Sequence, residues 1–272
     1  MTCPSTTLNA HSDTNKNPAP SASSRQALSL KSATRTGQPP AIYTVRMRFL
    51  VLGAGKTGSL VAEGARERHH QVRVLRSAEN RQGAALTAER LDGTDVVIDF
   101  TAPDAVLDNI AACVTAEKPI VVGTTGWYER MTHVRALVDA SGIGFLFGAN
   151  FSIGVNLLLD IARTASAATQ HGYTGQIFER HHVHKKDAPS GTAIAIQNAI
   201  RGACGEELEI TSFREGEVVG MHEVILDSPH DRIYLCHDAK SRRGFAEGAV
   251  RAAEWVVGKK GFFDFKDVWR EV

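Results

Sequence analysis

The sequence predicts an α/β protein, with a Rossmann-like, doubly wound parallel sheet followed by a second, α+β domain. Three observations predict this fold. A short apolar strand at residues 48–52 leads directly into a glycine-rich turn. Strands and helices then alternate as far as residue 147, which is typical of a parallel sheet covered by helices on both faces. After residue 150 this alternation gives way to two helices and a run of successive strands.

Length and composition exclude several classes of protein. The 272 residues are enough for two domains with a sizeable core. The formal net charge is +1, which argues against a general nucleic-acid binder. No stretch approaches the roughly 20 apolar residues of a membrane helix. The 4 cysteines are scattered without a Cys-x-x-Cys pair, which indicates reduced thiols and a cytoplasmic protein.

Residues 1–46 differ from the rest of the chain and predict a disordered leader. They are rich in Ser, Thr, Ala, Pro and Asn and hold few large apolar residues. Their basic, acid-poor composition resembles an organelle transit peptide, which would imply a plastid location. The alternatives are a plain disordered tail and upstream sequence translated from a misassigned start, since Met47 is a natural N-terminus for the following strand.

The glycine-rich turn predicts a dinucleotide site. The strand at 48–52 is followed by the turn, by an expected helix over 60–68 and by a strand over 71–75. In this context the Gly-x-Gly-x-x-Gly pattern allows a tight turn, close approach of a pyrophosphate, and packing of helix on strand. The predicted binding residues are Gly53, Ala54, Gly55, Lys56, Thr57 and Gly58. The spacing of an ATP-type phosphate loop is missing around the lysine.

The end of the second strand predicts which dinucleotide binds. Sites for NAD place an acidic residue there to hold the ribose 2′-hydroxyl. Here Arg76 and Ser77 occupy this place, and they suit the 2′-phosphate of NADPH. The alternative is that Arg76 is a solvated surface residue and Glu79 holds the ribose, in which case NADH is possible.

Two further strand ends are expected to line the nicotinamide. Strands are expected at 95–101, 119–122 and 144–147, with helices over 105–115 and 129–140 between them. In an open parallel sheet, ligands bind beyond the carboxyl ends of the strands. The residues at those ends are Phe100, Thr101, Gly123, Thr124 and Thr125. Ordinary turn chemistry is the alternative interpretation.

The second domain is expected to begin with a helix over 156–169. Three strand-like segments follow later, at 209–214, 218–226 and 232–237, and the last two alternate like an antiparallel hairpin. The chain closes with an expected helix over 246–257 and a tail over 261–269.

The densest group of reactive side chains lies in residues 178–193. Ser190, Gly191 and Thr192 stand where a loop enters an expected helix over 193–200, and a helix N-terminus offers unpaired N–H groups to a carboxylate or phosphate. Lys185 and the histidines before it add charge and groups that titrate near neutrality. The pattern favours a small dianionic substrate that must receive a proton. Simple helix capping, surface polarity and a zinc site are the alternatives.

With these residues in view, the chain from Met47 to Trp269 resembles the dihydrodipicolinate reductase family of lysine biosynthesis. The most specific match is the stretch His181-His-Val-His-Lys-Lys-Asp-Ala-Pro-Ser-Gly-Thr192. Supporting matches include Asp99-Phe-Thr-Ala-Pro103, Gly123-Thr-Thr-Gly126 and Asn150-Phe-Ser-Ile-Gly154. The resemblance implies an oxidoreductase that reduces 4-hydroxy-tetrahydrodipicolinate with NADPH or NADH.

The resemblance also implies a role for each matching residue. His181 would donate the proton, Lys185 would bind substrate and assist that transfer, and His182 would help to bind substrate. Ser190, Gly191 and Thr192 would hold a substrate carboxylate, and no metal is expected. Ala149, Asn150 and Phe151 would contact the cofactor. A dinucleotide domain over 47–149 and 243–272 would be joined to a substrate and tetramerisation domain over 150–242, so the expected partners are a small dianion and three further copies.

Two departures from the family leave the cofactor preference open. Many relatives carry a longer Gly-x-x-Gly-x-x-Gly turn, and the segment over 78–94 is shorter here than in the long forms of the family. Residues 1–46 have no counterpart in it. Outside the family, another two-domain amino-acid dehydrogenase or a non-catalytic dinucleotide-binding regulator are the alternative functions.

Overall fold

A computed structural model describes residues 46–272. The predicted leader lies outside these residues except for Arg46. Within the described part of the chain, no helix is both long enough and apolar enough to cross a membrane.

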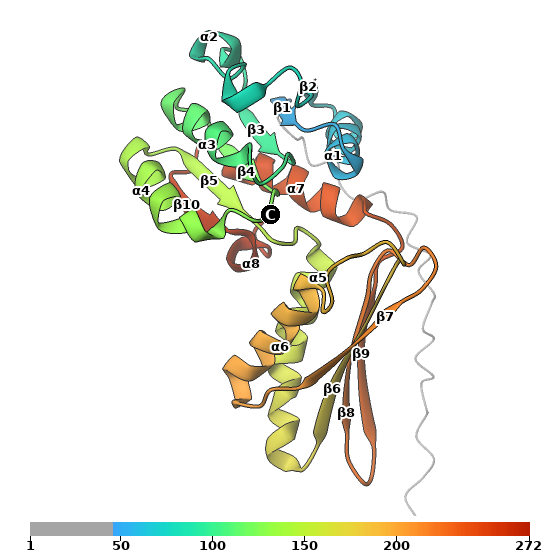
Figure 1. Ribbon diagram of the computed structural model, residues 1–272. Coiled ribbons are helices and arrows are strands. Elements are labelled where there is room, and N and C mark those ends of the chain that lie inside the picture. The colour runs from blue at the N-terminus through green and yellow to red at the C-terminus, as the bar shows by residue number, and fades with distance from the viewer. Residues whose placement is uncertain (1–45) are drawn as a thin grey trace, which may run out of the picture. The chain divides into compact units, whose positions relative to one another are not determined.

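Six parallel strands form the first sheet, in the order β10-β5-β4-β3-β1-β2 (Figure 1). In chain order they are β1 (Arg48–Leu52), β2 (Gln71–Leu75), β3 (Val96–Asp99), β4 (Ile120–Val122), β5 (Gly144–Phe147) and β10 (Gly261–Asp264). The chain reverses its direction of travel across the sheet between β1 and β3, which places a topological switch point beside the glycine turn after β1. This confirms the predicted Rossmann-like fold class.

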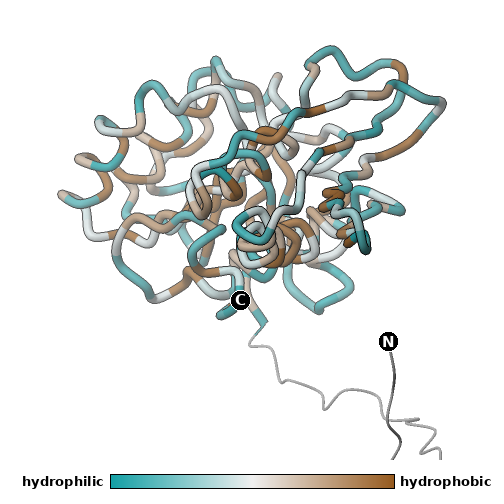
Figure 2. Tube along the Cα trace, turned by 90° about the horizontal axis from the view of Figure 1, so that it is seen from below, coloured by the Kyte–Doolittle hydropathy of each residue, from teal (hydrophilic) through white to brown (hydrophobic). Residues whose placement is uncertain are grey.

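Helices cover both faces of this sheet because its strands are apolar on both sides. Helices α1 (Lys56–Glu67) and α7 (Arg243–Val256) pack on the face that includes Val51 and Ile98. Helices α3 (Val106–Thr115) and α4 (Met131–Ser141) pack on the opposite face. Alternate strand residues therefore enter two separate cores, as expected for a buried parallel sheet. Hydrophobic residues lie mainly towards the inside of the fold, and hydrophilic ones mainly in the outer loops (Figure 2).

A second sheet has four strands in the order β7-β6-β8-β9. They are β6 (Thr174–His181), β7 (Glu209–Arg214), β8 (Met221–Asp227) and β9 (Arg232–Asp238). Strands β6 and β7 are parallel, whereas β8 is antiparallel to both β6 and β9. Helices α5 (Ile153–Ala165) and α6 (Gly191–Cys204) cover one face, and their contacts with it form a third core.

The other face of the second sheet is open among the described residues. Side chains there are exposed or half-buried, and Figure 1 shows α5 and α6 on one side only. Tyr234 is 56% exposed and Phe213 is 37% exposed. Such apolar exposure on a sheet is unusual for a surface that faces only water.

The structure differs from the sequence-based expectation at several element ends. Helix α1 begins at Lys56, four residues before the expected start, because the last half of the glycine turn is already helical. Helix α5 begins at Ile153, where Ser152 caps it by accepting from the Val155 N–H group at 3.3 Å. Strand β6 continues to His181, so this histidine lies on a strand and not in a loop.

The expected tail is in fact an edge strand and a helix. Residues Gly261–Asp264 pair in parallel with β5, and Phe262 stacks on Phe145 at a ring-centroid distance of 4.7 Å. The short helix α8 (Phe265–Val268) follows. The remaining short elements are α2 (Ala88–Leu91) and single 3-10 turns at Arg81–Gly83, Tyr128–Arg130 and Ser166–His171.

Candidate active site

The glycine turn after β1 leaves space where a pyrophosphate would lie. A Cβ atom at Gly53 would meet the Phe100 carbonyl oxygen at 2.3 Å, and one at Gly58 would meet the Gly53 carbonyl oxygen at 2.0 Å. These two glycines therefore allow the backbone to pack against itself. Above Gly55 there is no atom within 4 Å of the same position. The turn is thus tight at both ends and open at its middle, at the N-terminus of α1, which fits a dinucleotide pyrophosphate.

A buried carboxylate joins the two strand ends that were predicted to line the nicotinamide. Asp99 at the end of β3 is fully buried. Its oxygens accept from the Thr101 N–H group and the Thr124 hydroxyl, both at 2.8 Å, and from the Asn109 amide at 2.8 Å. Burial raises the pKa of Asp99, whereas these hydrogen bonds act in the opposite direction. The network fixes the Thr101 and Thr124 loops against each other.

Most of the predicted cofactor residues line two cavities that share Thr101. The Arg76 cavity, of about 510 Å³, is lined by Arg76, Ser77 and Thr101 among others. The glycine-turn cavity, of about 280 Å³, also contains Thr101 and is otherwise formed by the three strand-end loops. Its other predicted members are Gly55, Lys56, Thr57, Gly58, Phe100, Gly123, Thr124 and Thr125. Gly53 and Ala54 lie in the turn without lining either cavity.

The Arg76 cavity contains a second arginine that the sequence analysis missed. Arg81 lines it from the short turn after β2. One oxygen of the Glu79 carboxylate accepts the Arg76 N–H group at 2.8 Å. The two arginines together favour a phosphate over a bare 2′-hydroxyl at this end of the site.

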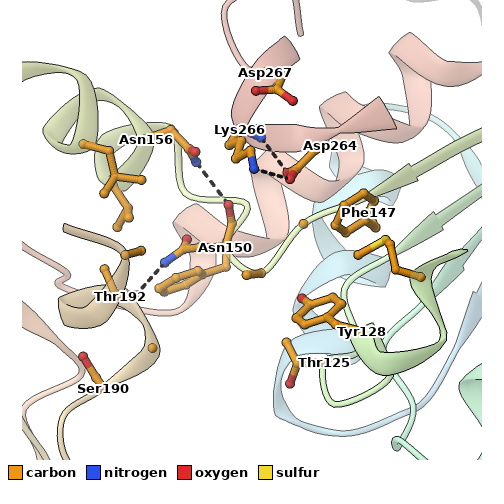
Figure 3. A pocket seen from close by; sticks show the side chains of 18 of the residues that line it. Thr125, Tyr128, Phe147, Asn150, Asn156, Ser190, Thr192, Asp264, Lys266 and Asp267 are labelled. Carbon is orange, nitrogen blue, oxygen red and sulfur yellow. Dashed lines mark hydrogen bonds and ion pairs between the residues drawn. The ribbon is translucent and has the colours of Figure 1, made fainter. Parts of the chain in front are cut away.

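A third cavity has one lining residue in common with the glycine-turn cavity. The His181 cavity, of about 960 Å³, shares Thr125 with the glycine-turn cavity and reaches His181 and Lys185. It also includes the predicted residues Ala149, Asn150, Ser190, Gly191 and Thr192. Figure 3 shows Ser190 and Thr192 on the side opposite Thr125 and Tyr128, with Asn150 between them. One cavity therefore holds both Thr125, a predicted cofactor residue, and the polar groups around Lys185 and Ser190.

The N-terminus of α6 lies in this cavity. Ser190 caps the helix, because its Oγ accepts from the Ala193 N–H group at 3.2 Å. Asn150 donates to the Thr192 hydroxyl at 3.2 Å and so connects the segment after β5 to this helix. Phe151, by contrast, is only 2% exposed and packs on Phe265 in the core. Its side chain supports the site from behind and does not line the cavity.

His181 offers one nitrogen to the cavity. Its Nδ1 is hydrogen-bonded to the Glu179 carboxylate, two residues earlier on β6. Its Nε2 lies beside Gly220, where a Cβ atom would approach to 3.0 Å. The absence of a side chain at Gly220 therefore keeps the Nε2 side of the ring uncrowded.

The charges around His181 oppose one another. Burial lowers the pKa of His181, and the cations Lys185 and Arg214 lower it too, whereas Glu179 raises it. The net effect is a pKa below the ordinary value for histidine. Burial acts to raise the pKa of Glu179. Hydrogen bonds from Ser212 and Arg214, together with His181, outweigh burial, and the pKa lies below its ordinary value. Glu179 is therefore an anion at neutral pH. A bound dianionic substrate would favour the protonated form of His181.

The structure separates the other residues of the histidine-rich stretch. Lys185 forms an ion pair with Asp187, with both Nζ–O distances 2.7 Å, and this pair lowers the pKa of Asp187. His182 does not line the His181 cavity, and its Nε2 lies 3.3 Å from the Arg242 guanidinium at the start of α7. The His184 side chain is 77% exposed.

His222 is a site residue that the sequence analysis did not assign. It lies on β8, is 4% exposed, and its Nε2 is 3.0 Å from Ser190 Oγ. Its ring is 5.1 Å from that of His181. Burial, with the nearby His181, lowers its pKa to about 4, so His222 is neutral near pH 7. The residue stands in a weaker family match, Gly220-Met-His222, to which no role was assigned, and the pairing of β6 with β8 brings it to the site.

Three of these groups also have the spacing of metal ligands. Glu179, His181 and His222 each offer one ligand atom, and these atoms lie within 4.8 Å of one another. The Arg214 guanidinium already contacts Glu179 at 2.9 Å, and a cation would have to compete with that charge. That no metal is needed stays a prediction, which metal analysis of the purified protein would test.

Comparison with known proteins identifies the family. The family described as "Dihydrodipicolinate reductase, N-terminus" matches residues 47–151, and its C-terminal counterpart matches residues 154–269. The chain is 39% identical over 196 residues to the 4-hydroxy-tetrahydrodipicolinate reductase of Neisseria meningitidis serogroup A, covering 64% of this chain and 72% of that protein.

The chain belongs to the dihydrodipicolinate reductase family.

Further members agree with this assignment. The 4-hydroxy-tetrahydrodipicolinate reductase of Christiangramia forsetii is 36% identical over 236 residues, which cover 82% of this chain and 97% of that protein. A dipicolinate-bound dihydrodipicolinate reductase from Paenisporosarcina has the same fold, with a TM-score of 0.68, 21% identity and coverage of 82% and 99%. As a member of this family the chain is an oxidoreductase with a dinucleotide-binding Rossmann domain.

Proposed function

We propose that this chain reduces 4-hydroxy-tetrahydrodipicolinate to tetrahydrodipicolinate, a step of lysine (diaminopimelate) biosynthesis. One observation carries the proposal. The His181 cavity, which holds the groups suited to a small dianion, shares the lining residue Thr125 with the cavity of the dinucleotide turn. A reduced nicotinamide, when bound, supplies a hydride to the substrate. The rest of the chemistry belongs to the side chains of this chain.

Two cationic or donor-rich places hold the two carboxylates of the substrate. The N-terminus of α6 offers the backbone N–H groups and hydroxyls of Ser190, Gly191 and Thr192. Lys185 faces the same cavity and can exchange its partner Asp187 for a substrate carboxylate. His182, held beside Arg242, contributes from the edge of the site as the substrate approaches. A neutral molecule would gain little from these charges.

His181 supplies the proton that must accompany the hydride. Its Nδ1 is engaged by Glu179, so the proton is donated from Nε2, on the side kept uncrowded at Gly220. Lys185 stabilises the negative charge that develops on the substrate before the proton arrives.

NADPH is the preferred reductant in this proposal. Arg76, Ser77 and Arg81 line the cavity at the adenosine end, and two guanidinium groups suit a 2′-phosphate. The cofactor contacts assigned to residues 53–58, Phe100, Thr101, Gly123–Thr125 and Ala149–Phe151 belong to the same proposal.

The proposal also covers the organisation of the chain. Residues 47–149 and 243–272 form the dinucleotide domain, and residues 150–242 form the substrate domain. Four copies assemble through the open face of the second sheet, which the exposure of Phe213 and Tyr234 supports. The mass of the protein in solution tests this. The free thiols of Cys113, Cys204 and Cys236 support a cytoplasmic location.

The experiment that tests the function is oxidation of NADPH and NADH by the full chain. The substrate is prepared fresh from pyruvate and aspartate semialdehyde with the preceding pathway enzyme. We expect rapid, substrate-dependent oxidation of NADPH and a weaker response to NADH. Oxidation of neither cofactor by folded protein that binds NADPH contradicts the proposal.

Arg76→Ala tests the cofactor preference in the same assay. Loss of one charge-assisted contact should reduce the preference for NADPH by about tenfold or more. Arg73→Ala is the matched control, because Arg73 is exposed on the same strand and does not line the cavity. An unchanged preference in Arg76→Ala would assign the 2′-phosphate to other groups.

A further inference from the structure

A buried ion pair lies directly behind the two reactive groups of the site. Glu179 is fully buried on β6, and Arg214 stands at the end of the neighbouring strand β7. The Arg214 Nη1 atom donates to Glu179 Oε1 at 2.9 Å. Glu179 Oε2 is the atom that contacts His181 Nδ1. The two oxygens of one carboxylate are therefore divided between an arginine and the catalytic histidine.

The same guanidinium reaches the loop that carries Lys185. Its Nη2 atom donates to the Asp187 carbonyl oxygen at 2.5 Å. Asp187 in turn holds the Lys185 ammonium. Arg214 thus connects by one hydrogen bond to the partner of His181 and by another to the segment that bears Lys185. Lysine could not replace it, since a single ammonium lacks the rigid fork that spans both acceptors.

We propose that Glu179 and Arg214 are positioning residues that act together, Glu179 setting the ring orientation and charge of His181 and Arg214 fixing both Glu179 and the Lys185 loop. This inference deepens the proposed function and rests on it. The carboxylate accepts the Nδ1 proton, which fixes the ring with Nε2 directed to the cavity. Arg214 keeps the carboxylate ionised and prevents it from turning away.

Four charged or titratable groups of the described residues act on the His181 ring. Glu179 approaches from its own strand, Arg214 from β7, Lys185 from the following loop and His222 from β8. Only Glu179 among them favours the protonated ring, and the others are cationic or neutral. Removing its charge should therefore make His181 harder to protonate, beyond any effect on geometry.

Glu179→Gln tests the first half of the proposal. Glutamine has the same size but no charge, so kcat should fall by about 10- to 100-fold, with a much smaller change in KM for the substrate. In the ligand-free protein, an NMR titration of the ring nitrogens should give a lower pKa for His181 than in the wild type. Glu215→Gln is the matched control, because Glu215 follows Arg214 in sequence and its side chain is 65% exposed. The control should leave kcat and the titration unchanged.

Arg214→Lys tests the second half and does not depend on the buried glutamine being tolerated. Losing the guanidinium fork that joins Glu179 to the Asp187 carbonyl oxygen should lower kcat. It should also raise KM for the substrate, because the Lys185 loop is no longer fixed. Arg201→Lys is its control, since Arg201 is exposed on α6 and pairs only with nearby surface groups.

The outcomes separate this inference from the proposed function. If wild-type protein lacks reductase activity, the proposed function fails, whatever the NMR titration gives. If the wild type is active, an unchanged His181 titration in Glu179→Gln, or wild-type kcat in that variant, overturns the role of Glu179. An unchanged KM in Arg214→Lys overturns the link to the Lys185 loop.

Discussion

At the scale of single residues, the two neighbouring histidines of the site have different hydrogen-bond partners. Burial and the nearby His181 lower the pKa of His222 to about 4, although Glu179 acts in the opposite direction. The pKa of His181 is also lowered, but the Glu179 carboxylate at its Nδ1 limits this decrease. One ring is therefore fixed as a neutral partner of Ser190, while the other can be protonated when a dianion binds.

This difference predicts a pH dependence of stability. As the pH falls below about 6.5, the unfolded chain protonates His222, whereas the folded chain does so only near pH 4. The free energy of unfolding should therefore decrease as the pH falls between these values, by up to about 3 kcal/mol from this residue.

Denaturant unfolding of the wild type and of His222→Gln at several pH values measures this contribution. The variant should lose less stability on acidification than the wild type. His230→Gln is the control, because His230 is exposed in the turn between β8 and β9. Identical pH profiles for the wild type and His222→Gln would be inconsistent with a buried neutral histidine.

The reactive residues were predictable from sequence, but their supporting partners were not. Ser190, Gly191 and Thr192 were placed at a helix start, and α6 begins there. Glu179 lies within the stretch 178–193 but no role was predicted for it, and His222 and Arg214 lie more than 20 positions beyond that stretch. Strand pairing alone brings them to His181, through the registers of β6 with β7 and β8.

At the scale of elements, the dinucleotide site depends on how two loops are held together. Asp99 at the end of β3 accepts hydrogen bonds from the loops after β3 and β4 and from Asn109 on α3. Gly123 sits so close to Phe100 that a Cβ atom there would meet the Phe100 ring at 2.2 Å. These loops are thus a single packed unit and not two independent turns.

Asp99→Asn should loosen this unit. The amide nitrogen that replaces one oxygen cannot accept hydrogen bonds from the N–H and O–H groups around it. This loss should lower the free energy of unfolding by about 1–3 kcal/mol. The dissociation constant for NADPH should rise with it, because both loops line the same cavity. Asp139→Asn, at an exposed position on α4, serves as the control in thermal unfolding and in cofactor titration. Unaltered stability and cofactor affinity in Asp99→Asn would refute this role of the carboxylate.

The alternating elements of the first sheet were predictable because β1, β3, β4 and β5 each hold a short apolar run. The exceptions have physical reasons. Strand β10 was predicted as part of a tail because it has only four residues. Its pairing with β5 defines it as a strand. The early start of α1 at Lys56 follows from the N-terminal turn of the helix being built from the glycine motif itself.

At the scale of the whole molecule, three cavities are related by shared lining residues. Thr101 lines both the Arg76 and the glycine-turn cavities, and Thr125 lines both the glycine-turn and the His181 cavities. Most of the lining residues that the sequence predicted lie at a strand end or a helix start. The sequence did not reveal that Arg81 lines the Arg76 cavity, or that Asn150 contacts Thr192 in the His181 cavity. Neither contact follows from a local pattern, because both depend on how the chain folds.

The most direct test of the account is substrate-dependent NADPH oxidation by the wild type and by His181→Gln. We predict that the variant binds NADPH normally but turns over about 100-fold more slowly or worse, because the general acid is lost. His184→Gln, on the same stretch but with its side chain 77% exposed, should retain wild-type turnover. Wild-type turnover in His181→Gln would contradict the central claim that this histidine supplies the proton in the cavity beyond Thr125.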